Sequence, residues 1–260
     1  MDKDSEVFIR HIQDLMTRSY MQNRPFYSEF LSLEESGLVY SKLHGDTGVS
    51  IDLYGGYQNA ERQILVIVPK GYDLTQSSMP ICCIRIEPMQ FRFHDELSHR
   101  DYLGALINLG IERNLLGDIV IHQETKKGHA YPVAYVFCLS RICEFIIDNL
   151  SKVRHTQVVC QKETEYEIQY EPSFEELTGT VASSRLDAVL AFLTKQSRNH
   201  VITLIGEKKV FINNICMQNV SYRLKENDVI RIRGYGKYIY QSDGMLTKKG
   251  RLVIHVLKYI

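Results

Sequence analysis

Residues 184–213 constrain the fold of this chain more than any other stretch, because they predict two short helices followed directly by a strand. Ser184 and Asp187 have the spacing of a capping box at the start of the first helix. Ser197 is a typical N-cap for the second helix. Apolar residues recur at the spacing of one helix face in the first segment: Leu186, Val189, Leu190 and Leu193. The stretch therefore predicts a helix–helix–strand unit on a very small scaffold.

The ends of these two predicted helices carry positive charge. Arg185 opens the first helix, Arg198 opens the second, and Lys208-Lys209 leads into the strand, so we expect a cationic surface there. The stretch resembles the αL-type RNA-binding module first known from small-subunit ribosomal protein S-four. The matching residues, in chain order, are Arg185-Leu186-Asp187, Ser197-Arg198, Val210, Asn213 and Asp228. The resemblance implies RNA binding, and the two aspartates are expected to hold helix and turn geometry rather than to touch RNA.

The charge of the chain is divided unevenly, although Lys plus Arg and Asp plus Glu both number 31. Residues 183–260 contain 14 basic and 5 acidic side chains, a net charge of 14 − 5 = +9. The rest of the chain has 17 − 26 = −9. A basic C-terminal third on an acidic body is typical of a nucleic-acid module on a separate scaffold, although a solvated basic face without a partner has the same charge. The acidic N-terminal two-thirds is a possible protein-docking surface.

Composition favours an ordinary globular protein of two or three small domains, since the chain has 260 residues with 44% hydrophobic and 24% charged side chains. No apolar run is long enough to span a bilayer, and the first sixteen residues lack the apolar core of a signal peptide, so we expect a cytoplasmic protein without a membrane partner. The six cysteines form no CxxC pair, which favours buried, reduced thiols over a metal site or a disulfide framework. No cofactor is expected.

The middle of the chain predicts a ferredoxin-like (RRM-like) domain. Strands and helices follow in the order β-α-β-β-α-β, which is that of the split βαβ fold. The predicted elements are a strand at 81–88, a helix at 98–110, strands at 117–123 and 130–137, a helix at 140–150 and a strand at 156–161.

The two ends of the chain complete an α+β fold of three small domains. The N-terminal part predicts helices at 4–20 and 28–35, with strands at 49–57 and 62–69. Residues 163–176 lack clear periodicity, and we expect them either to link the last domain or to pack against it. The expected domains are a helical unit with a hairpin at 1–75, the ferredoxin-like domain at 78–170 and the αL-type RNA-binding domain at 180–260.

A second resemblance covers most of the chain. The chain looks like the YlmH family of bacterial RNA-binding proteins. The resemblance lies in residues 54–69 and 98–121, and in the αL-type module with its continuation at 233–237. The resemblance implies a cytoplasmic protein, often encoded beside cell-division genes. It also implies a link to ribosome-associated quality control on stalled large subunits that carry peptidyl-tRNA.

We therefore expect a non-enzymatic protein that binds rRNA or tRNA on a ribosomal subunit through phosphate contacts. The expected contacts are Arg185, Lys195, Arg198, Lys208, Lys209, Arg233 and Lys237. His99 and Arg100 form a possible second RNA contact. Two other functions stay open: an RNA-modifying enzyme whose chemistry lies around His99, Arg100 and Asp101, and a cell-division adaptor that binds protein through the acidic body.

Overall fold

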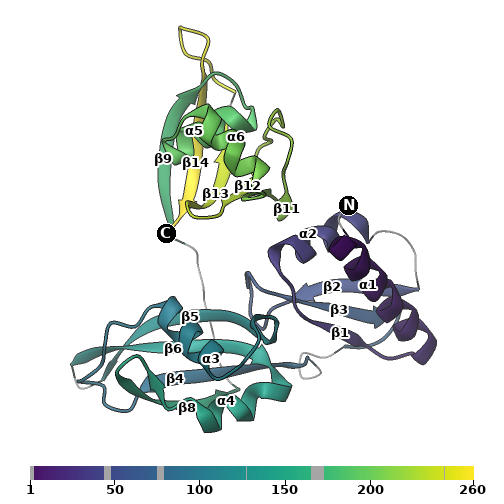
Figure 1. Cartoon of the computed structure of the whole chain (residues 1–260), viewed down its shortest axis with the longest axis vertical. Coiled ribbons are helices and arrows are strands. Elements are labelled where there is room, and N and C mark those ends of the chain that lie inside the picture. The colour runs from purple at the N-terminus through teal and green to yellow at the C-terminus, as the bar shows by residue number, and fades with distance from the viewer. Residues whose placement is uncertain (1–2, 44–47, 75–78, 127, 165–172, 243) are drawn as a thin grey trace. The chain divides into compact units, whose positions relative to one another are not determined.

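The computed structural model of the chain describes residues 3–43, 48–74, 79–126, 128–164, 173–242 and 244–260 (Figure 1). The chain divides into two compact units, one formed by Met1–Ser32 with Gly45–Tyr170 and the other by Leu33–His44 with Glu171–Ile260. The expected division into three domains is therefore not confirmed. Within the described ranges, no helix is long and apolar enough to cross a membrane.

The first unit begins with a three-stranded antiparallel sheet that carries helix α1. Its elements are α1 (Lys3–Gln22), β1 (Phe26–Phe30), β2 (Val49–Tyr54) and β3 (Ile64–Pro69), with strand order β1-β3-β2. Helix α1 packs on β3 and buries Ile12 completely. The first helix and both later strands were expected, but a helix at 28–35 is wrong. Residues Phe26–Phe30 pair with β3 instead, and helix α2 (Leu33–Lys42) begins only after them.

The central part of the first unit has the expected β-α-β-β-α-β order. Its elements are β4 (Ile81–Pro88), α3 (His99–Asn108), β5 (Leu116–Lys126), β6 (His129–Leu139), α4 (Cys143–Asn149), β7 (Lys152–Val153) and β8 (Thr156–Glu163). The strand order β5-β6-β4-β8-β7 is that of a ferredoxin-like sheet with a short additional strand, β7, at its edge. Helices α3 and α4 cover one face of this sheet (Figure 1) and bury Leu106 and Ile146 against Ile84 and Val136.

The other face of the central sheet is partly covered by the N-terminal sheet. Phe30 and Val66 of the N-terminal sheet form one apolar cluster with Val120 and Phe137 of the central sheet. Strand alternation explains the arrangement, because successive side chains of β6 point to opposite faces. The two sheets consequently share a core, which is why they form one compact unit.

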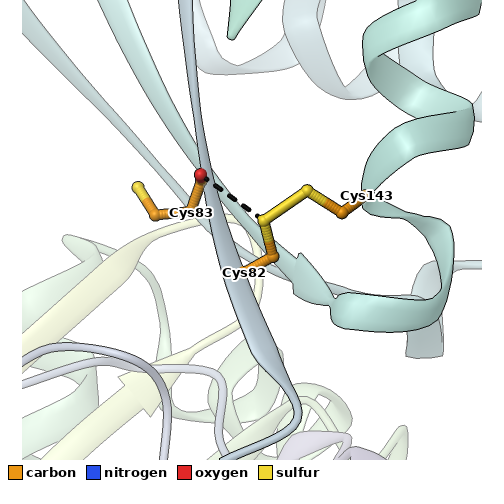
Figure 2. The surroundings of a disulfide bond; sticks show 3 residues. All are labelled: Cys82, Cys83 and Cys143. Carbon is orange, nitrogen blue, oxygen red and sulfur yellow. Dashed lines mark hydrogen bonds between the residues drawn. A yellow bond between two sulfur atoms is a disulfide. The ribbon is translucent and has the colours of Figure 1, made fainter. Parts of the chain in front are cut away.

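The structure records a disulfide between Cys82 of β4 and Cys143 at the start of α4 (Figure 2). The expectation of reduced thiols is therefore wrong for these two residues. Packing of α4 on the sheet brings their Cα atoms to 6.3 Å, within the range that a disulfide spans. Cys83, Cys138, Cys160 and Cys216 remain thiols.

The second unit is built on a six-stranded sheet with order β11-β10-β12-β13-β14-β9. Its elements besides α2 are β9 (Phe174–Val181), α5 (Leu186–Thr194), α6 (Arg198–Gly206), β10 (Val210–Ile212), β11 (Ile215–Cys216), β12 (Val229–Ile232), β13 (Gly236–Gln241) and β14 (Leu252–Tyr259). Strand β9 pairs along its whole length with β14, so the end of the segment 163–176 packs against the last domain, which is one of the two expected arrangements. Helices α5 and α6 cover one face of the sheet (Figure 1).

The tight turn between β10 and β11 packs closely against α2. Asn213 and Asn214 have left-handed φ values of 50° and 66°, as a two-residue hairpin turn requires. Helix α2 packs on β11, and a Cβ atom on Gly37 would lie 2.3 Å from the carbonyl oxygen of Asn214. Only glycine permits this approach, so α2 is fitted closely to the second unit.

Candidate nucleic-acid interface

The starts of α5 and α6 position two arginines of the predicted interface. Ser197 is the N-cap of α6, as expected, and its hydroxyl accepts a 3.2 Å hydrogen bond from the backbone N–H of His200. The expected cap at Ser184 is wrong, because Arg185 occupies the N-cap position of α5. The carboxylate of Asp187 is engaged by the Arg185 side chain, whose Nε donates to it at 3.0 Å.

Asp187 fixes the position of Arg185 and lies near Arg198. Its side chain is 7% exposed, whereas that of Arg185 is 44% exposed. Burial by itself would raise the pKa of Asp187, but the hydrogen bond and charge of Arg185, with the charge of Arg198, outweigh it and lower the pKa below the ordinary 3.8. No ion pair involves Arg198 among the described residues, and its side chain is exposed.

This lowered pKa predicts how acid affects the second unit. A carboxyl group whose pKa is depressed in the folded state stabilises the fold above its unfolded pKa, and this stability is lost as the pH falls through the folded value. We expect the melting temperature of the second unit to fall more steeply below about pH 4 in the wild type than in Asp187→Asn. Thermal unfolding at a series of pH values checks this, with the exposed carboxylate variant Glu176→Gln as control. Equal slopes for Asp187→Asn and wild type would contradict it.

A second group of cations lies where α6 leads into β10. Lys208 has a left-handed φ of 56°, and Lys209 forms an ion pair with Glu207 at 2.7 Å. The backbone N–H of Arg233, in the turn between β12 and β13, donates to the carbonyl oxygen of Lys209 at 2.9 Å. The Arg233 guanidinium lies 4.9 Å from the ring centroid of Phe211 and 3.2 Å from the Glu34 carboxylate.

His200 and Tyr235 connect the two groups. His200 Nε2 and the Tyr235 hydroxyl lie 3.1 Å apart, which ties the first turn of α6 to the turn that carries Arg233. We call the resulting set the α6 cation surface; it consists of Arg185, Arg198, Lys208 and Lys209, with Arg233 at its edge. The Arg233 guanidinium lies over Phe211, which points away from the helices because its neighbours Val210 and Ile212 lie in the core beneath them. Neither His200 nor Tyr235 was expected at the site. The sequence signals were His200 three residues after the cap, and Tyr235 flanked by Gly234 and Gly236.

The structure does not bring Lys195 and Lys237 together with this surface. Lys195 is the left-handed C-cap at the opposite end of α5, with a φ of 54°. The Lys237 ammonium lies 4.1 Å from the ring centroid of Tyr259. Because the neighbouring Tyr238 is buried in the core under the helices, alternation along β13 places Lys237 on the other face of the sheet.

Asp228 holds the turn before β12, as the sequence predicts. Its side chain is buried and accepts hydrogen bonds from the Lys225 backbone N–H at 2.8 Å, the Asn213 amide at 2.8 Å and the Tyr222 hydroxyl at 3.3 Å. The Asn213 side-chain oxygen in turn accepts from the Val229 N–H at 2.8 Å. Both residues of the αL-type pattern therefore act within the scaffold.

His99 and Arg100, the possible second contact, lie at the start of α3 in different surroundings. His99 lines a pocket with Tyr57, Glu61 and Asp118. Partial burial lowers the pKa of His99, and the nearby Arg113 adds to this effect. Arg100 lines a separate groove on the side of α3 that faces β7.

One group of side chains has the ligand types of a metal site. The sulfur atoms of Cys82, Cys138 and Cys143 lie within 4.8 Å of one another and are buried. Two of them form the disulfide, and burial raises the pKa of the Cys138 thiol to about 12. Because metals bind the thiolate, this group does not favour a metal at neutral pH.

The chain matches known families over the ferredoxin-like sheet and over the C-terminal region that contains α5 and α6. The family model described as "Putative RNA-binding domain in YlmH" matches residues 81–167, and the S4 domain matches residues 184–230. The chain is similar to the ribosome-associated protein quality control protein P2 of Bacillus subtilis (strain 168), with 26% identity over 253 residues, 96% of this chain and 93% of that protein. A solved structure, the cell division protein ylmH from Streptococcus pneumoniae, is similar at a TM-score of 0.48 and 21% identity, covering 63% of this chain and 93% of that one.

The two family matches fall on the two parts of the structure that the sequence singled out. The first spans the ferredoxin-like sheet, and the second begins at Ser184 and contains α5, α6 and the turn held by Asp228. The curated relative extends this likeness over nearly the whole chain. The chain therefore carries the two domains that the sequence resemblance to the YlmH family predicted, a YlmH-type RNA-binding domain at 81–167 and an S4 domain at 184–230.

Proposed function

We propose that this protein binds structured RNA, rRNA or tRNA on the large ribosomal subunit, and acts in the cytoplasm in quality control of stalled translation. It binds through the α6 cation surface and does not alter the RNA covalently. The ribosomal assignment takes its support from the name of the Bacillus subtilis relative, and RNA as the ligand from the S4 match.

The observation that carries the proposal is the arrangement of cations around a rigid scaffold. Arg185 is held by Asp187, and Arg233 by its backbone bond to Lys209, while Arg198 starts a helix whose first turn is capped by Ser197. The side chains themselves are accessible, with 44% exposure for Lys209 and 54% for Arg233. Such a surface presents several positive charges in fixed relative positions, which suits the regular spacing of phosphates along an RNA helix.

The acidic partners on this surface do not prevent phosphate binding. The pairs of Lys209 with Glu207 and of Arg233 with Glu34 are largely exposed, and such pairs contribute about 1 kcal/mol or less. A phosphate can therefore replace either carboxylate at small cost, and counterions released from the RNA add a salt-dependent driving force.

Binding without chemistry fits the surroundings of the residues that suggested an enzyme. Asp101 accepts hydrogen bonds from the backbone N–H and the hydroxyl of Ser98, so it completes the capping box of α3. His99 lines a different pocket from the groove that Asp101 and Arg100 share. A general base must lie within hydrogen-bond reach of its partner, and this arrangement does not provide that.

Charge reversal at Arg198 tests the proposal. We expect Arg198→Glu to weaken binding to purified large ribosomal subunits about tenfold at 0.1 M salt, because one phosphate contact is lost and a repulsion is introduced. Co-sedimentation at several salt concentrations measures the effect. The thermal melt should not change, since Arg198 is exposed.

Lys248→Glu is the matched control, because Lys248 is an exposed lysine of the same unit outside the α6 cation surface, and its reversal changes the net charge equally. Binding of Lys248→Glu should remain within about twofold of wild type. Equal losses in both variants would show that only net charge matters. Full binding by Arg198→Glu would contradict the proposed surface.

A further inference from the structure

Many RNA-binding folds of ferredoxin-like topology use the sheet face that their helices leave uncovered for base stacking. Here, apolar residues of the N-terminal sheet cover one part of that face, where Phe30 and Val66 pack on Val120 and Phe137. Phe137 is 0% exposed and its ring stacks on Tyr57 at a centroid distance of 4.9 Å. These aromatic side chains are therefore unavailable to a base.

The remainder of that face is occupied by an internal ion network. Arg85 donates to Glu124 at 2.6 and 2.8 Å and to Glu87 at 2.8 Å. The hydroxyls of Tyr131 and Tyr135 also lie within hydrogen-bond distance of Glu124. With one guanidinium and two carboxylates, this network has a net charge of −1, and its cation is already paired with both carboxylates, so the network does not favour phosphate.

A groove on the opposite side of the domain has the reverse character. It lies between one face of α3 and the hairpin formed by β7 and β8, and its walls include Arg100, Asp101, Gly104, Ser151, Lys152 and Arg154. Arg100 and Gly104 lie one helical turn apart and therefore face the groove together. Arg154 lies in the hairpin turn with a left-handed φ of 51°.

Two of the cations that line the groove, Arg100 and Lys152, are available to bind phosphate. The Asp101 carboxylate is already engaged by Ser98 and lies 3.7 Å from the Arg154 guanidinium. For Arg100 and Lys152, no ion pair or hydrogen bond is recorded in the described ranges, and both side chains are exposed. The lining thus has a charge of 3 − 1 = +2 on a unit that is otherwise acidic.

The floor of the groove is open to a ligand backbone. A Cβ atom added to Gly104 would meet nothing within 4 Å, so α3 presents a bare backbone to the groove at this point. A sugar–phosphate chain can then approach the helix closely while its phosphates reach the cations on either side.

We propose that this groove binds the phosphodiester backbone of RNA, and that the YlmH-type domain contacts RNA by its helical side rather than by its sheet. The inference rests on the proposed RNA-binding function and adds a second contact surface to the α6 cation surface. Arg100 and Lys152 neutralise phosphates, while Arg154 is held by Asp101 at the rim.

The test uses the full-length chain with the double substitution Arg100→Glu/Lys152→Glu. The probe is purified ribosomal RNA of the large subunit, titrated at several salt concentrations. We expect Kd to rise about tenfold and the slope of log K against log salt to fall by about 1.5, since two phosphate contacts are lost. Arg10→Glu/Lys162→Glu, which changes the charge of the same unit equally at exposed residues outside the groove, should leave both quantities unchanged.

The outcomes separate this inference from the proposed function. If wild type binds the RNA and Arg198→Glu loses affinity while the groove variant keeps its affinity and slope, the groove assignment is overturned and the α6 cation surface stands. If wild type does not bind the RNA at all, the proposed function itself fails. If the groove variant binds RNA normally but no longer binds polyglutamate, the groove takes acidic protein segments and the RNA assignment is overturned. Unchanged thermal melts in all variants exclude unfolding as the cause.

Discussion

Replacement of Gly56 by alanine is expected to reduce the free energy of unfolding of the first unit by about 2–5 kcal/mol. Gly56 has a φ of +101°, which an L side chain rarely adopts, and this strain costs about 1–2 kcal/mol. A Cβ atom there would also lie 2.4 Å from the Phe137 ring. Because Phe137 is buried between the two sheets, it has no free space to move into, and overpacking of this kind costs about 1–3 kcal/mol more.

Gly110→Ala provides the control for the Gly56 substitution. Gly110 has a φ of +83°, but a Cβ atom there would meet nothing within 4 Å, so only the backbone strain of about 1–2 kcal/mol applies. Hydrogen exchange of amides in β3 and β6 measures both losses within the first unit. A Gly56→Ala loss no larger than that of Gly110→Ala would show that the two sheets do not share the core described above.

Replacement of Asp228 by alanine is expected to destabilise the second unit by about 3–4 kcal/mol. Its carboxylate accepts from a backbone N–H, an amide and a hydroxyl, and removal leaves these three partly buried donors without their acceptor. The affected donors belong to the turn before β12 and to the Asn213 turn, which together fix the edge of the sheet. Urea unfolding monitored by hydrogen exchange of β10 and β12 amides measures the loss.

Asp228→Asn separates loss of the hydrogen bonds from loss of side-chain volume. The amide keeps one carbonyl oxygen in the same place, so we expect about half the loss seen with alanine. Arg198 is distant in sequence and remains exposed, so RNA binding below the melting temperature should persist in both variants. Equal losses for alanine and asparagine would contradict the role assigned to the carboxylate.

Much of the fold is predictable from the sequence where pattern and pairing are local. The β-α-β-β-α-β order of the central domain, the capped start of α6 and the Asn213-Asn214 turn all depend on residues within a few positions. Strand β1 could not be predicted in this way, because its partner β3 lies more than thirty residues further along the chain. Strand β9 is an edge strand whose residues are mostly exposed, so it shows no apolar alternation.

Some features of the candidate site could likewise be predicted from local sequence, and others could not. The sequence correctly indicated that Asp228 serves the scaffold, because capping and turn residues follow local rules. It could not indicate that Lys237 faces away from α6, since that depends on which face of β13 is covered. Nor could it place Arg100 beside Lys152, because the groove forms only when the β7–β8 hairpin packs near α3.

The way the chain is divided between the two units determines which residues an S4-domain fragment must contain. Its compact unit includes Leu33–His44 from the N-terminal part, so the chain passes from one unit to the other three times. A fragment beginning at residue 180 would lack α2 and six of the eight residues of β9. Strand β11 would then lose the helix that packs on it, and β14 would lose most of its partner strand on one side. For the intact protein, the same three crossings tie the two proposed RNA-binding surfaces together at more than one point of the chain. Engagement of RNA at one proposed surface would raise the local concentration of that RNA at the other, and modest individual contacts would then add up to a long residence time.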